Sequence, residues 1–172
     1  PNKTFAIPMS YYWSHLKASG AELLLKNLLK DSVVLENKLL LRKRLKRIRM
    51  AIKNYPINKA SYDLIKAKLV ELQYIGGTRI RFRSSTNAED IKGFNGAGLY
   101  SSHTGIMHAD SGKTIERAIK KVWASAWNES AFREREYFGI HQRTVAMGVL
   151  VHEAFGTEDV NGVAITKNLY RK

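Results

Sequence analysis

The segment 79–100 constrains the fold of this chain more than any other part. Its first residues alternate between cations and apolar side chains: Arg79, Ile80, Arg81, Phe82 and Arg83. A period of two is typical of a β-strand with one buried face. After Arg83 the alternation stops, and hydroxyl residues, an amide and carboxylates follow, together with Gly93, Gly96 and Gly98.

This composition favours a phosphate-binding loop at the end of a strand. Glycines let backbone N–H groups approach phosphate oxygens, hydroxyls add donors, and arginine offers a planar fork of donors. The alternative is an ordinary strand and turn whose arginines are only solvated.

The segment occurs in a fixed order with four other short blocks. The five blocks are Phe5–Tyr12, 83–98, Val122–Trp127, Arg133–Ile140 and Asn161–Thr166. Together they resemble the phosphoenolpyruvate synthase and pyruvate phosphate dikinase family, in its N-terminal nucleotide-binding domain, which has an ATP-grasp fold. The basic region 22–54 carries no part of this resemblance.

The resemblance also implies roles for individual residues. Arg83 aligns with the arginine that contacts nucleotide phosphates, and is therefore the candidate catalytic residue. The stretch 93–98 aligns with the loop that closes over the phosphates, and the stretch 148–154 aligns with the hinge strand beside adenine. The nucleotide-binding residues expected on this basis are Arg83, Ser84, Ser85, Thr86, Gly93, Gly96, Gly98, Val151, His152, Glu153 and Thr166.

By the same resemblance, the parent protein is a phosphotransferase that uses ATP. The phosphoryl group passes to a histidine on another, mobile domain and then to pyruvate or a similar acceptor. The family module begins before Phe5 and continues past Thr166, where its magnesium ligands lie. We therefore expect a partial ATP-grasp domain that lacks the Mg²⁺ site and is inactive alone. A nucleotide-binding regulatory domain without catalysis is an alternative.

A second feature is the positive charge, +14 overall with a pI near 10.0. Much of it lies between Arg42 and Lys53, where apolar residues recur every three or four positions, so that an amphipathic helix is expected. Its cationic face suits nucleic acid, an anionic membrane surface or an acidic partner. No aromatic residues are interleaved with these charges, which disfavours nucleic acid. The simpler interpretation is a core-packed helix with a solvated face.

The pattern along the chain predicts an α/β (α+β) protein of one partial domain, 1–172. Residues 1–76 are mainly helical, and 77–172 form a strand–loop–helix part with a mixed sheet. Helices are expected at Met9–Ala18, Ala21–Leu29, 31–54 (capped by Asp31 or Ser32), Asn58–Gln73, Lys113–Trp127 and Glu129–Phe138. Strands are expected near Phe5–Pro8, at 79–83, Gly98–Gly105, Thr144–Val151 and Gly162–Thr166.

Several other classes of protein are excluded or disfavoured. The chain has no cysteine, so disulfides are impossible and a cytoplasmic protein is expected. No apolar run is long enough to span a bilayer, and the histidines show no metal-ligand spacing. The run Ser111–Thr114 lacks the first glycine of a P-loop and predicts a helix cap instead. His103 is expected to be an ordinary strand residue, and Trp123 and Trp127 to be core residues.

Overall fold

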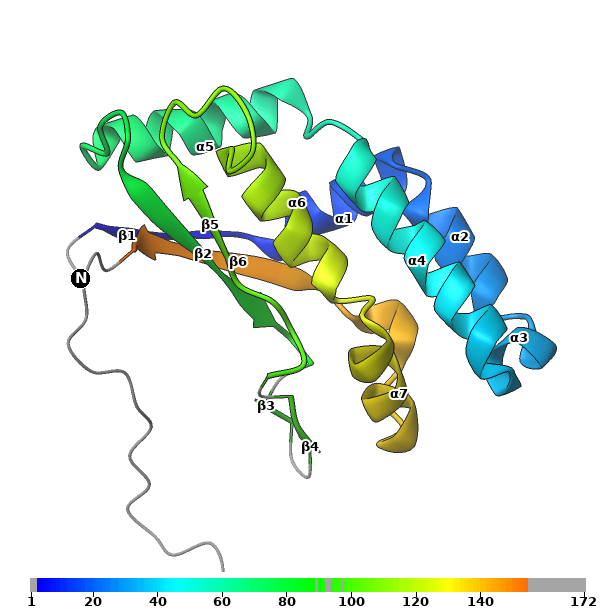
Figure 1. Ribbon diagram of the computed structural model, residues 1–172. Coiled ribbons are helices and arrows are strands. Elements are labelled where there is room, and N and C mark those ends of the chain that lie inside the picture. Colours follow the sequence, from blue (N-terminus) through cyan, green and yellow to red (C-terminus); the bar gives the residue numbers. More distant parts are fainter. Residues whose placement is uncertain (1–2, 89, 92–93, 97, 155–172) are drawn as a thin grey trace, which may run out of the picture.

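Strand β2 (Arg79–Thr86) lies inside a four-stranded sheet in the computed structural model (Figure 1). The structure describes residues 3–88, 90–91, 94–96 and 98–154. The strand order is β1 (Thr4–Ile7), β6 (Met147–Glu153), β2 and β5 (His103–Ile106). Ile80 and Phe82 are completely buried, whereas Arg79 and Arg83 are exposed. The alternation predicted for this strand is confirmed.

The strand extends further than its alternation predicted. It continues through Ser84, Ser85 and Thr86, which the sequence placed in the loop, and Thr86 lies opposite Met147 of β6. A strand needs backbone partners more than apolar side chains, and the long strand β6 supplies those partners. The phosphate-loop candidate therefore begins after Thr86.

Helix α6 (Ile115–Ser125) packs against one face of this sheet. Its apolar residues Ile115, Ala118, Ile119 and Val122 are buried. Trp123 and Trp127 are also buried, which confirms that they are core residues. The helix lies close to β5 at Gly105, where a Cβ atom would lie 3.1 Å from Ile115 Cα and 3.0 Å from Phe82 Cε2. A larger residue at this position would therefore force its neighbours to shift.

The remaining helices complete the α-layer. They are α1 (Met9–Ala18), α2 (Ala21–Leu28), α3 (Ser32–Glu36), α4 (Lys38–Asn54), α5 (Lys59–Glu71), α7 (Glu129–Tyr137) and the 3-10 turn η1 (Gln142–Thr144). Figure 1 shows α6 between the sheet and α4, and α4 also contacts α2 and α3. The buried side of α4 consists of four apolar residues: Leu41, Leu45, Ile48 and Ile52.

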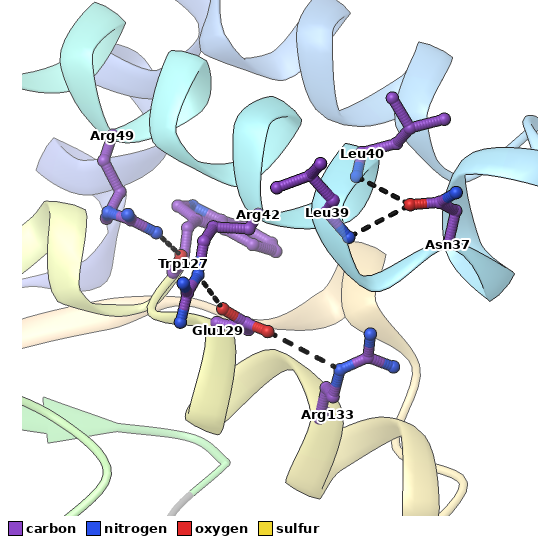
Figure 2. A network of polar contacts seen from close by, with 8 residues as sticks. All are labelled: Asn37, Leu39, Leu40, Arg42, Arg49, Trp127, Glu129 and Arg133. Atoms are coloured by element: carbon purple, nitrogen blue, oxygen red, sulfur yellow. Dashed lines mark hydrogen bonds and ion pairs between the residues drawn. The ribbon is translucent and has the colours of Figure 1, made fainter.

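The start of the basic helix differs from the prediction. Asp31 caps only the short helix α3, through a hydrogen bond from Val34 N–H (3.1 Å). Asn37 then caps α4, because its Oδ1 accepts from Leu39 N–H and Leu40 N–H, both at 3.0 Å (Figure 2). Asn37 has an extended backbone, which ends α3 and begins α4. The expected single helix is thus two helices.

The α/β class is confirmed, with one correction to the predicted layout. Every strand pairing in the described part is antiparallel, so the sheet there is not mixed. Strand β1 confirms the strand expected near Phe5–Pro8, and it pairs with β6 in this sheet. The expected strand Gly162–Thr166 lies outside the described residues. The ATP-grasp assignment and the division at residue 76 stay predictions.

Two further strand predictions were wrong at their boundaries. The strand expected at Gly98–Gly105 forms only from His103, since the residues before it make a turn in which Leu99 N–H donates to Gly96 O (3.1 Å). The strand expected from Thr144 begins at Met147, because Gln142–Thr144 is a 3-10 turn.

Candidate nucleotide-binding site

The face of β2 opposite α6 carries a row of guanidinium groups. Because successive residues of a strand point to opposite faces, Arg79, Arg81 and Arg83 project away from the buried Ile80 and Phe82. Their Cα atoms follow one another at about 7 Å, two residues apart along the strand. Such a row attracts anions, and each guanidinium offers paired donors to a phosphate.

Strand β6 adds to the same face, which we call the arginine face. His152 lies opposite Arg81 and Leu150 lies opposite Arg83. Arg81 is held from its other side, because its Nη1 donates to Thr104 Oγ1 of β5 (3.2 Å). Arg83 is exposed at its position on the face. Arg79 and Arg83 are therefore the exposed arginines of this face, and Arg83 is the one nearer the glycine-rich segment.

The three expected hinge residues fall on different sides of the sheet. Val151 is completely buried and lies opposite Phe82, so its side chain belongs to the core. His152 is nearly buried beside Arg81, and its Nδ1 donates to the carbonyl of Glu153 (2.7 Å). Glu153 is exposed. Only His152 shares the arginine face, and an adenine contact of the others stays a prediction.

The three hydroxyl residues are also divided between the two faces. Ser85 lies opposite Gly148 on the arginine face and is exposed, whereas Ser84 lies opposite Val149 on the core side. Thr86 Oγ1 accepts a hydrogen bond from Ala88 N–H (3.2 Å), which shapes the chain where it leaves β2. Ser85 is therefore the hydroxyl residue best placed beside Arg83.

The glycine-rich segment follows the end of β2 and contains a short hairpin. Its strands are β3 (Asp90–Ile91) and β4 (Phe94–Asn95). Gly96 is buried, and Gly98 has a φ of +80°, a conformation that glycine adopts without steric cost. Gly93 and Thr166, also expected to bind nucleotide, lie outside the described residues.

The glycine-rich segment is anchored at its far end by a buried arginine that sequence reasoning missed. Arg135 of α7 is completely buried and donates to Tyr100 Oη (3.2 Å), Gln142 Oε1 (2.9 Å) and Ala126 O (2.7 Å). Burial lowers the pKa of the Arg135 guanidinium, and Tyr100 partly opposes this. The Tyr100 hydroxyl donates in turn to Ala88 O (2.9 Å). Both ends of the segment are thus tied to α7.

A second unpredicted anchor is the side chain of Asn87. Its Nδ2 donates to Thr144 O (2.8 Å), and its Oδ1 accepts from Ala146 N–H (2.8 Å). These two bonds join the end of β2 to the start of β6. The arginine face is therefore built on two strands that are fixed to each other at the end where the glycine-rich segment begins.

Other candidate motifs have structural roles. Thr114 caps α6, since its Oγ1 accepts from Arg117 N–H (3.2 Å), as predicted for the Ser111–Thr114 run. His103 lies on β5 as predicted, and burial lowers its pKa, assisted by the charges of Lys121 and Arg81. In the described ranges, no group of three or more His, Asp or Glu side chains is placed to hold a metal ion.

None of the helices in the described residues has the length and apolar character needed to cross a bilayer.

The described residues form an α/β unit whose cationic sheet face adjoins a glycine-rich turn, an arrangement suited to phosphate-containing ligands. The chain belongs to the family of pyruvate phosphate dikinase AMP/ATP-binding domains, whose family model matches residues 1–171. The match spans the basic region 22–54 as well, which the five blocks had not linked to the family.

Proposed function

We propose that this chain binds the phosphates of ATP on its arginine face and forms the ATP-binding part of a dikinase-like phosphotransferase. The observation that carries the proposal is the row of Arg79, Arg81 and Arg83, placed beside a glycine-rich turn in a member of an AMP/ATP-binding family. Arg83, exposed and next to the turn, is the residue proposed to contact the reacting phosphate.

Phosphoryl transfer depends mainly on positioning and on neutralising the phosphate charge. Arg83 supplies a fixed positive charge with five donors, and Ser85 lies two residues away on the same face. Mg²⁺ would supply further charge neutralisation, but the described residues offer no cluster of carboxylates for it. By the family resemblance the magnesium ligands are expected outside this segment, and the proposed roles here are those of this chain's own side chains.

The acceptor steps rest on the family resemblance. In the parent protein, a histidine on another domain would take the phosphoryl group from ATP and pass it to pyruvate or a similar small acceptor. His103 is a poor candidate for that histidine, because it is half-buried on β5 and the family's histidine lies in a separate domain.

The proposal is tested by calorimetric titration of the chain with Mg-ATP. A charge-assisted contact to phosphate contributes about 1.5–3 kcal/mol, so Arg83→Ala should weaken binding by about 10- to 150-fold. Arg117→Ala is the matched control, since Arg117 is an exposed arginine on α6, away from the arginine face. The ATP affinity of this variant should stay within about twofold of that of the unmutated chain.

Equal losses in both variants would show a general charge effect and contradict the site. An ATP affinity indifferent to Arg83 would do the same. A catalytic module can be distinguished from a regulatory nucleotide-binding domain by assaying phosphohistidine formation from ATP in the parent protein. A catalytic module should form phosphohistidine, and the Arg83→Ala variant should lose this activity.

A further inference from the structure

Helix α4 carries more positively charged side chains than make polar contacts within the fold. Its seventeen residues include eight lysines and arginines and no carboxylate. With 3.6 residues per turn, these cations fall into separate rows around the helix. One row faces α6 and α7, and another lies on the side directly opposite the buried stripe.

The row facing α6 and α7 holds the helix in place. Arg42 Nε forms an ion pair with Glu129 of α7 (2.8 Å), and Arg49 Nη1 donates to the carbonyl of Trp127 (2.6 Å), as Figure 2 shows. Burial lowers the pKa of Arg49, and the charge of Glu129 opposes this shift. These two arginines are explained by the fold.

The row opposite the core is not explained by the fold. It consists of Leu39, Lys43, Lys46 and Met50, spaced by four, three and four residues, and all four are exposed. Leu39 is 60% exposed and Met50 is 42% exposed. In the part of the chain that the structure describes, no carboxylate lies within ion-pair distance of Lys43 or Lys46. We call these four residues the outer row.

We propose that the outer row of α4 is a docking surface for an acidic amphipathic helix of a protein partner. The surface presents two central cations between two apolar ends, along about 17 Å of helix. Its complement is a helix of about three turns with carboxylates in the middle and apolar residues at both ends. This interaction is separate from nucleotide binding on the arginine face.

The composition of the outer row distinguishes this partner from other polyanions. A nucleic acid would use the lysines but leave Leu39 and Met50 without a role, and the row offers no aromatic side chain for stacking bases. An anionic membrane would need a broad apolar face, whereas the apolar stripe of α4 is buried in the core. An acidic amphipathic helix uses both kinds of side chain.

The test measures fluorescence anisotropy of a labelled peptide of about 12 residues, with glutamates at helical spacing between terminal leucines. Its comparison is a scrambled peptide of the same composition. We expect the amphipathic peptide to bind the chain more tightly at moderate salt, and Lys43→Glu with Lys46→Glu to reduce its affinity about tenfold or more. Leu39→Gln with Met50→Gln should remove the preference for the amphipathic order.

The matched control is Lys17→Glu with Lys113→Glu, two exposed lysines outside α4. Each reversal removes two charges, so both double variants lower the net charge from +14 to +10. Circular dichroism checks that every variant is folded. The proposal would be overturned by equal affinity for both peptides or by an equal loss of affinity in the control variant. It would also be overturned if the chain bound duplex DNA or anionic vesicles more tightly than the peptide and this binding depended on Lys43 and Lys46.

Discussion

Replacing Arg135 with methionine should destabilise the fold substantially, although no carboxylate pairs with it in the described contacts. The substitution leaves two buried acceptors, Gln142 Oε1 and Ala126 O, without their donor, whereas the Tyr100 hydroxyl keeps its hydrogen bond to Ala88 O. Each orphaned acceptor costs about 1–3 kcal/mol, and the smaller desolvation cost of methionine offsets part of that loss. We expect a net loss of about 2 kcal/mol, equivalent to about 4–8 °C in Tm for a chain of this size.

The assay is urea unfolding followed by tryptophan fluorescence, because the guanidinium of Arg135 lies 5.4 Å from the ring centre of Trp127. Arg133→Met is the matched control, since Arg133 is on the same helix but is partly exposed, with only long ion-pair distances of 3.9 and 4.0 Å. Its effect should be below about 1 kcal/mol. An Arg135→Met variant as stable as the unmutated chain would show that the hydrogen bonds of Arg135 do not stabilise the fold.

Three further predictions concern other parts of the fold. Gly105→Ala should destabilise by about 1–3 kcal/mol in thermal unfolding, because its Cβ would meet backbone at 3.1 Å, whereas Gly76→Ala, with its nearest contact at 3.5 Å, serves as the control. Asn37→Ala should cost about 1 kcal/mol through loss of the α4 cap, and no change would contradict the role of that cap. Burial lowers the pKa of His15 below 6.5, so the unfolded state protonates first and the free energy of unfolding should fall as the pH drops below about 6.5. His15→Gln should flatten that pH dependence, and an unchanged slope would contradict it.

The parts of the fold that were predicted correctly have local signals. The alternation of Arg79–Arg83 identified a half-buried strand, and the apolar stripe of α6 identified a core helix. The basic helix ends at Asn54 as expected, because the following proline disfavours helix in the residue before it. Each of these signals lies within one element and needs no knowledge of its neighbours.

The errors occurred where distant residues decide the structure. The polar end of β2 becomes strand because β6 pairs with it, and the sequence of β2 alone does not reveal that partner. Asp31 and Asn37 are both good capping residues, so local signals could not decide that each begins a separate helix. Arg135 is buried because acceptors from three other segments surround it. The ligand contacts of Arg83 and the other expected site residues stay predictions.

ATP binding on the arginine face is tested most directly by hydrogen–deuterium exchange with and without saturating Mg-ATP. ATP should slow amide exchange in residues 79–88 and 147–153, where β2 and β6 form that face. Helix α4 should be unaffected. Slower exchange confined to α4, with β2 and β6 unchanged, would place the anion on the basic helix and contradict binding on the arginine face.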